Sequence, residues 1–170
     1  AMQRRHFNAL TAASLGLGFC RPSNALDSPK QPTVLRVGGK IGNKNAGEFA
    51  DLDMPMLSAL PQHSFTTNTP SWYAKAHQFT GPLLREVLKA VDAQGSKLRA
   101  EALDAYKVDI PASDAQEFDV IIARLLDGQP MPVRNKGPLF IIYPFDSSSQ
   151  LRSQRYYSRS IWQLKSITVL

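Results

Sequence analysis

A chain of 170 residues is long enough for one domain with a hydrophobic core, and 43% apolar with 20% charged residues is ordinary for a globular protein. Its formal net charge of +6 falls to +3 without residues 1–25, which hold three arginines and no acidic residue. So small a charge excludes the concentrated basic face of a nucleic-acid-binding protein.

The first 25 residues are predicted to be a secretory signal peptide. Arg4 and Arg5 precede an apolar run at residues 7–19, and small residues follow up to Ala25. The run is too short for a permanent membrane anchor, and no longer apolar run follows it. We therefore expect a soluble periplasmic protein.

Two features of this segment bear on export and on chemistry. Residues 3–7 resemble a twin-arginine signal, and the general secretion route stays open beside it. Cys20 is the only cysteine, and Phe19 before it disfavours a lipoprotein site. Cleavage removes Cys20, so we expect a mature chain with no disulfide, no thiolate nucleophile and no thiolate metal ligand.

The domain is predicted to span residues 34–170 after a polar, proline-containing linker at 26–33. Residues 34–37 form the first predicted strand, which a Gly-Gly pair ends in a turn. Asp53 is predicted to cap a short helix with Pro55 in its first turn.

Residues 64–72 are predicted to be a loop that carries hydroxyl side chains, Asn68 and Trp72. Hydrogen-bonding groups beside one large ring suit a planar polar ligand such as a pterin. The alternative is that these residues fill a sheet edge without binding anything.

A core helix is predicted next. Thr80 is expected to cap it, a Gly-Pro pair lies in its first turn, and apolar residues recur on one face up to Val91. Gly95 ends it, and residues 98–103 are predicted to be extended.

The following region is predicted to be rich in strands. Residues 120–123 and 131–133 are expected to pair across an Asp-Gly hairpin turn at 127–128. Residues 139–143 form a continuous apolar run, which is typical of a strand buried on both faces.

A cluster of arginines and tyrosines precedes the last predicted strand. Both residue types are enriched at interface hot spots, so the cluster is a candidate site for a protein partner or an anionic ligand. The alternative is a charged extended segment with no binding role. The candidates are Arg152, Arg155, Tyr156, Tyr157 and Arg159.

Taken in order, four segments resemble the sulfite-oxidase-type molybdopterin-binding domain over roughly residues 60–170. Residues 79–88 match its GxxLxxxL helix, 102–111 its DxYxxxxP segment, 136–144 its GxPLRxxxP strand and 162–169 its closing strand. The resemblance implies an α+β fold, a single domain of mixed β-sheets with a few short helices.

The resemblance also carries expectations about chemistry. Asp104 and Tyr106 match the acid and the tyrosine of the DxY segment, and in the enzymes that tyrosine lies close to the active site. The enzymes bind molybdenum through a cysteine upstream of the first helix, whereas residues 64–72 contain none. We therefore expect binding of a reduced, metal-free pterin rather than catalysis.

Small periplasmic relatives of this kind are linked to regulation of membrane-bound cyclic-di-GMP enzymes, so the expected partner is the periplasmic domain of such a protein. The alternative function is that of a molybdenum-cofactor (molybdopterin) oxidoreductase or its subunit, and a ligand-free adaptor is a third hypothesis. Trp72 is expected to stack on the pterin, and Arg134 to reach its polar edge. The predicted ligand site comprises Thr67, Asn68, Thr69, Trp72, Tyr106 and Arg134.

Overall fold

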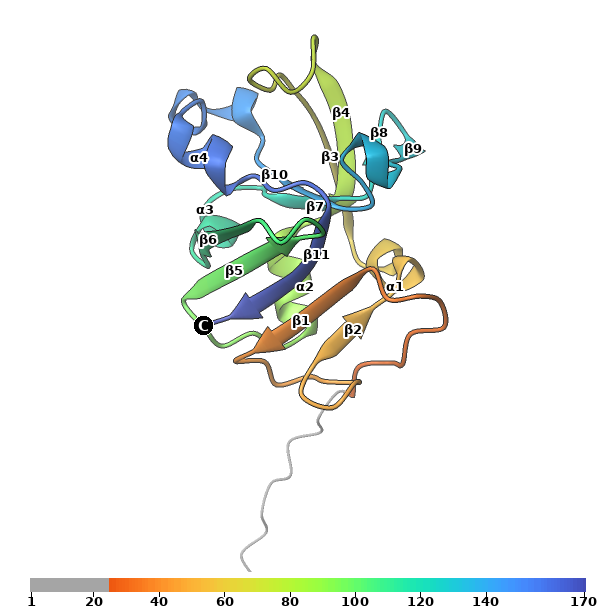
Figure 1. Ribbon diagram of the computed structural model, residues 1–170. Helices are drawn as coiled ribbons and strands as arrows, with labels where there is room; N and C mark the ends of the chain where they lie inside the picture. The colour runs from red at the N-terminus through yellow and green to blue at the C-terminus, as the bar shows by residue number, and fades with distance from the viewer. Residues whose placement is uncertain (1–24) are drawn as a thin grey trace, which may run out of the picture.

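A five-stranded mixed sheet forms one end of the computed structural model, which describes residues 25–170 (Figure 1). Its strands are β1 (Leu35–Gly39), β2 (Ala50–Leu52), β5 (Lys97–Ala102), β6 (Lys107–Pro111) and β11 (Leu164–Val169). Their order is β2-β1-β11-β5-β6, with β1 and β11 parallel and the other neighbours antiparallel. The last strand therefore lies in the middle of the sheet. The predicted signal peptide, apart from Ala25, lies outside the described residues.

Two smaller antiparallel sheets form the other end. Their strands are β3 (Gln62–Thr67), β4 (His77–Pro82), β7 (Ile121–Ala123), β8 (Leu125–Leu126), β9 (Gln129–Pro130) and β10 (Phe140–Ile142). Strands β3-β4-β8-β9 form one sheet, and β7 pairs with β10 in the other. Figure 1 shows the β3–β4 hairpin rising away from the five-stranded sheet.

The helices are all short. They are α1 (Met54–Ala59), α2 (Leu84–Ala90), α3 (Asp114–Glu117), α4 (Gln154–Arg159) and the 3-10 turns η1 (Val133–Asn135), η2 (Phe145–Ser147) and η3 (Ser149–Leu151). Within residues 25–170, none is long and apolar enough to cross a membrane. Mixed sheets with a few short helices are the predicted fold, which is confirmed.

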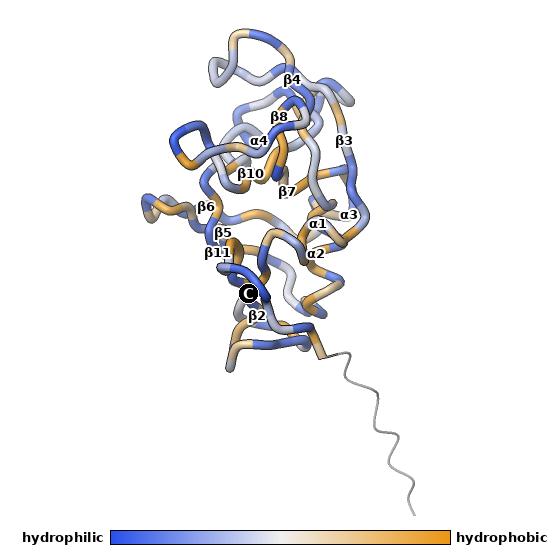
Figure 2. Tube along the Cα trace, turned by 90° about the vertical axis from the view of Figure 1, so that its right-hand side faces the viewer, coloured by the Kyte–Doolittle hydropathy of each residue, from blue (hydrophilic) through white to orange (hydrophobic). Residues whose placement is uncertain are grey.

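The core is centred on β7 and β10, where the hydrophobic colour gathers in Figure 2. Every residue of both strands is buried, and residues 139–143 are all at 0% exposure, as predicted for a strand covered on both faces. Burial of large apolar side chains is the main stabilising contribution at such positions, roughly 1.5 to 3 kcal/mol each.

Asp53 caps α1 as predicted. Its carboxylate accepts a hydrogen bond from the backbone N–H of Met56 at 2.9 Å and two more from Lys30 and Gln31. These backbone N–H donors hold the pKa of Asp53 below its usual range, although its desolvation acts in the opposite direction. The cap also ties the predicted linker to the domain.

The predicted start of the core helix was wrong. Thr80 and the Gly-Pro pair after it belong to β4, and the helix begins only at Leu84, with no side-chain cap. The backbone of β4 pairs with both β3 and β8, and a Cβ on Gly81 would collide with the carbonyl oxygen of Ile122. Glycine is therefore needed for close strand packing rather than for a helix terminus.

Three further local predictions were wrong. Residues 64–67 belong to β3 rather than to a loop, and residues 154–159 form α4 rather than an extended segment. The Asp-Gly turn is present at 127–128, but it joins β8 to β9. Strand β7 instead pairs with β10, because the buried apolar run at 139–143 offers a better hydrophobic partner than residues 131–133.

Candidate functional site

Three segments that are distant in sequence line a cavity of about 490 Å³. They are the loop after β3, the β5–β6 turn, and helix α4 with the residues that follow it into β11. This volume lies within the range of small-molecule sites. The lining residues are Pro70, Ser71, Trp72, Ala102, Asp104, Tyr106, Gln154, Tyr157, Ser158, Ser160, Ile161 and Trp162.

Aromatic rings dominate its wall. The ring centroids of Trp72 and Trp162 lie 5.6 Å apart, and Tyr157 lies 6.1 Å from Trp72, both edge to face. The Trp72 ring also packs on Phe140 and Phe145, with ring centroids 5.9 and 5.8 Å apart. Aromatic pairs in this geometry contribute about 0.5 to 1.5 kcal/mol each beyond their burial. The rings therefore form a fixed surface for a flat ligand.

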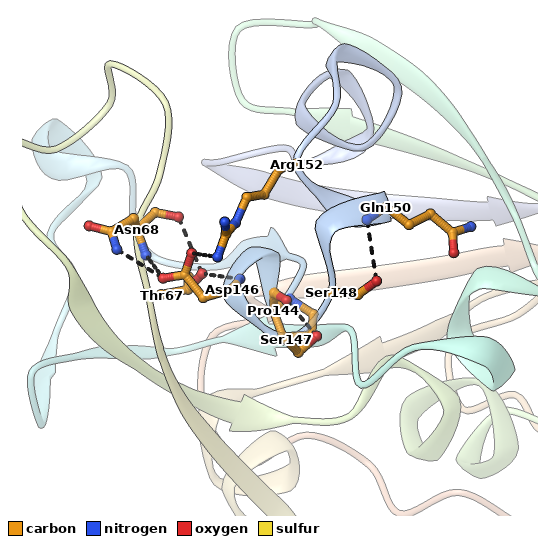
Figure 3. Close-up of polar contacts among 8 residues, drawn as sticks. All are labelled: Thr67, Asn68, Pro144, Asp146, Ser147, Ser148, Gln150 and Arg152. Atoms are coloured by element: carbon orange, nitrogen blue, oxygen red, sulfur yellow. Dashed lines mark hydrogen bonds and ion pairs between the residues drawn. The ribbon is translucent and has the colours of Figure 1, made fainter.

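The loop that carries Trp72 is fastened to η2 by hydrogen bonds (Figure 3). Asp146 Oδ2 accepts from the backbone N–H and the side-chain amide of Asn68 at 2.7 and 2.9 Å, and Arg152 lies 3.2 Å from Oδ1. In return, the Thr67 hydroxyl accepts from the N–H of Asp146 at 3.1 Å. The Asn68 donors, with Arg152, hold the pKa of Asp146 below its usual range, against its desolvation.

A second cavity of about 310 Å³ adjoins the first and shares Pro70 and Tyr157 with it. Asn68, Thr69 and Arg152 line it, together with Phe145 and Asp146. The Thr69 hydroxyl oxygen is buried and has no hydrogen-bond partner among residues 25–170. An unpaired buried hydroxyl is uncommon, because leaving it unsatisfied costs about 1 to 3 kcal/mol.

A buried polar network fixes α4 against the domain. Asp114 Oδ2 accepts hydrogen bonds from the Tyr143 hydroxyl and from Arg159 Nη1, each at 2.7 Å. Burial, and then the bond to Asp114, raises the pKa of Tyr143 far above its ordinary value. Tyr156, only 4% exposed, packs its ring 5.4 Å from that of Tyr143. The opposite face of α4 is free to line the cavity through Gln154, Tyr157 and Ser158.

The structure brings together part of the predicted ligand site. Trp72 and Tyr106 line the main cavity, and Asn68 and Thr69 line the adjoining one. Thr67 is buried and acts in the loop fastening. Arg134 does not reach the site: it lies exposed in η1 and lines neither cavity.

The predicted partner cluster is divided between the surface and the interior. Arg152 and Arg155 are exposed, and Tyr157 is half-buried in the cavity wall. Tyr156 is not available to a partner, because its ring is buried in the core, and Arg159 is engaged by Asp114. Helix formation causes the division: Tyr156 and Arg159, three positions apart, share the face that packs on the domain, whereas Arg155 lies on a different face.

Sequence reasoning did not select Trp162 or Asp104 for the site. Trp162 was assigned to a strand, but it packs edge to face on Trp72 and lines the cavity. Lys136 lines neither cavity, although its Nζ lies 5.1 Å from the Trp162 ring centroid. Asp104 had a signal, its match to the DxY segment, whereas local pattern gave none for Trp162.

The side chains available as metal ligands show which part of a molybdopterin cofactor this site fits. Residues 25–170 contain no cysteine, and they hold no group of three or more His, Cys, Asp or Glu side chains that suits a metal ion. A thiolate-bound molybdenum therefore does not fit this site. The aromatic cavity does fit the flat organic ring system in size and in chemistry.

Comparison with known proteins agrees with the fold. The family model for the oxidoreductase molybdopterin binding domain matches residues 34–147, which hold the sheets except β11. Helix α4 and Trp162 follow the matched range. A search among curated proteins gave no match. Because the family match covers more than half of the chain, the protein belongs to the oxidoreductase molybdopterin-binding domain family.

Proposed function

We propose that this protein binds a reduced, metal-free pterin in the aromatic cavity and does not carry out molybdenum chemistry. The observation that carries the proposal is the arrangement of Trp72, Trp162 and Tyr157, whose rings form the wall of a cavity of about 490 Å³. A pterin has flat apolar faces and a polar edge, which such a wall and its neighbouring polar groups complement.

The lack of a thiolate supports the metal-free form. In the loop where the enzymes carry their cysteine, Asn68 and Thr67 are committed to Asp146, and Thr69 offers only a hydroxyl oxygen. Soft metal centres depend on thiolate or imidazole ligands with an ordered supporting shell. The loop provides neither of these ligands.

We further propose that the protein is periplasmic and regulates a membrane-bound cyclic-di-GMP enzyme by contacting its periplasmic domain. The signal-like segment and the resemblance to small regulatory relatives support this role. The mouth of the cavity adds a structural reason: Leu103 and Tyr106 are 47% and 52% exposed beside it, and Arg155 is exposed on α4. A partner that binds there distinguishes the filled from the empty cavity, as a ligand-dependent signal requires.

Calorimetric titration with a reduced pterin under anaerobic conditions tests ligand binding. We expect saturable one-to-one binding that Trp72→Ala weakens at least about tenfold, since Trp72 provides the stacking surface. Phe49→Ala removes an exposed aromatic ring that does not line the cavity and should leave affinity unchanged. Equal affinities for all three proteins would place the ligand elsewhere.

Partner binding requires a separate experiment. The protein purified from periplasm is incubated with the periplasmic domain of a cyclic-di-GMP enzyme encoded in the same organism, with and without pterin. We expect pterin to strengthen the interaction and Arg155→Glu to weaken it. If the pterin-free protein binds as tightly, the ligand is not the signal.

A molybdenum-cofactor oxidoreductase is the second candidate, because family membership favours it. The buried, unpaired Thr69 hydroxyl is an oxygen that a metal could use in place of a thiolate. Elemental analysis of protein purified from its own host distinguishes the two. We expect no stoichiometric molybdenum, and about one molybdenum per chain would favour the oxidoreductase.

A further inference from the structure

One charged side chain lines the aromatic cavity. Of its twelve lining residues, all within the described part of the chain, Asp104 is the only one with an acidic or basic side chain of the Asp, Glu, Lys, Arg or His type. The others are aromatic, aliphatic, hydroxyl or amide residues. A cavity with one carboxylate and no lining cation disfavours an anionic ligand and favours one that presents N–H donors.

The carboxylate of Asp104 is only partly used by the fold. One oxygen, Oδ1, accepts the backbone N–H of Tyr106 at 3.0 Å, and this bond closes the turn between β5 and β6. Within residues 25–170, Asp104 has no ion-pair partner, whereas the neighbouring Glu101 is paired with Lys107 and Lys165. Ionised carboxylates accept several hydrogen bonds at once, so Asp104 retains capacity to bind a ligand.

The backbone fixes the position of this carboxylate. Ala105 has a left-handed conformation with φ of 68°, which is uncommon for a residue with a Cβ. This conformation and the Asp104 bond to Tyr106 give a tight turn that holds Asp104 and Tyr106 at the same cavity. Asp104 therefore lies at the solvent-exposed edge of the cavity whose wall includes Trp72 and Trp162.

We propose that Asp104 determines ligand specificity by binding a 2-amino-4-oxopyrimidine edge, in which an exocyclic amino group and a ring N–H donate side by side. This inference rests on the proposed pterin binding and adds a selection rule to it. Two parallel N–H donors meet a carboxylate in the bidentate geometry of an arginine–carboxylate pair, and charge-assisted bonds of this kind are about twice as strong as neutral ones. Pterins carry this edge, and so does guanine.

The test compares ligands that differ only at that edge. Lumazine has the same fused rings as pterin, with an oxygen in place of the 2-amino group. We expect the native protein to bind pterin at least about tenfold more tightly than lumazine, since one charge-assisted donor is replaced by an acceptor that faces a carboxylate. Calorimetry at neutral pH gives both dissociation constants.

The Asp104→Asn variant separates ligand recognition from turn structure. Asparagine retains an oxygen that accepts the Tyr106 N–H, so the turn and the melting temperature should be preserved. Its side chain offers one acceptor and one N–H donor group in place of two acceptors, so pterin affinity should fall, lumazine affinity should rise, and the discrimination between the two ligands should be lost. Asp92→Asn is the matched control, because Asp92 is exposed and does not line this cavity.

Each outcome has one meaning. Equal binding of pterin and lumazine by the native protein, or undiminished discrimination in Asp104→Asn, overturns the role of Asp104 while pterin binding stands. Tighter binding of guanosine than of pterin keeps the edge recognition and rejects pterin as the ligand. Binding of none of the three compounds rejects the proposed function and this inference with it.

Discussion

Replacement of Arg159 by alanine should destabilise the domain, because it leaves the carboxylate of Asp114 buried without its cation. The Asp114 side chain is 6% exposed and that of Arg159 is 21% exposed, so solvent replaces little of the lost interaction. Removing one partner of a buried ion pair typically costs 3 to 5 kcal/mol. We expect the lower end, about 3 kcal/mol, since Tyr143 still donates to Asp114.

For a domain of this size, that loss corresponds to a decrease in melting temperature of roughly 6 to 12 °C. Arg155→Ala is the matched control on the same helix: its side chain is exposed and has no ion-pair partner among residues 25–170, so it should change stability by less than about 0.5 kcal/mol. Thermal melts and urea titrations measure both variants. The reasoning fails if Arg159→Ala melts like Arg155→Ala, and Arg159 would then regain its predicted place on a partner surface.

Four further outcomes follow from the structure. Gly81→Ala should lower stability by about 1 to 3 kcal/mol in urea titration, because its new methyl group meets the Ile122 carbonyl in close-packed backbone. Gly128→Ala measures the effect of backbone strain without a steric clash, because Gly128 has a positive φ but open space at its Cβ. Arg134→Ala should leave pterin affinity unchanged, since Arg134 lines neither cavity; a tenfold loss would place the ligand edge at η1. Trp72→Phe should retain more stability than Trp72→Ala in thermal melts, because a smaller ring still packs on Phe140 and Phe145. The pKa of Asp146 is depressed in the folded state, so the stability that its carboxylate contributes is present at neutral pH and lost as the pH falls below about 4. Near-ultraviolet circular dichroism should report loosening of the Trp72 loop in that acidic range. The Asp146→Asn variant should lack this transition.

The strand framework was predictable from the sequence wherever burial or turn chemistry dominates. Residues 139–143 could hardly be anything but a buried strand, and the Asp-Gly pair at 127–128 formed its turn. Asp53 was predictable as a cap because proline follows it within the first turn. In each case a local rule and the tertiary structure agree.

Residues whose structure depends on distant partners were not predictable. Thr80 is as good a helix cap as it is a strand residue, and only the pairing of β4 with β3 and β8 decides between them. Helix α4 has six residues, too few to be stable alone, and it exists because Tyr156 and Arg159 bind a core that is assembled elsewhere.

The candidate site shows the same limit. Trp72 was identified because polar groups surround it in sequence, and Tyr106 through its match to a family segment. Trp162 and Asp104 reach the same cavity from two other segments, 58 positions apart in the chain. No local sequence pattern shows which distant segments come together at the cavity. The presence of an aromatic ring in the site was therefore predictable, but the full set of its lining residues was not.

The central place of β11 constrains when the protein can fold. Residues 164–169 lie between β1 and β5, so the five-stranded sheet cannot close while the ribosome still holds that segment. The pairing of β1 with β11 joins residues about 130 positions apart, a long-range contact of the kind that slows folding. Synthesis therefore delivers an open chain, with Leu35 and Val37 unburied on its first strand until the last strand arrives. Until β11 pairs, these apolar side chains are open to aggregation.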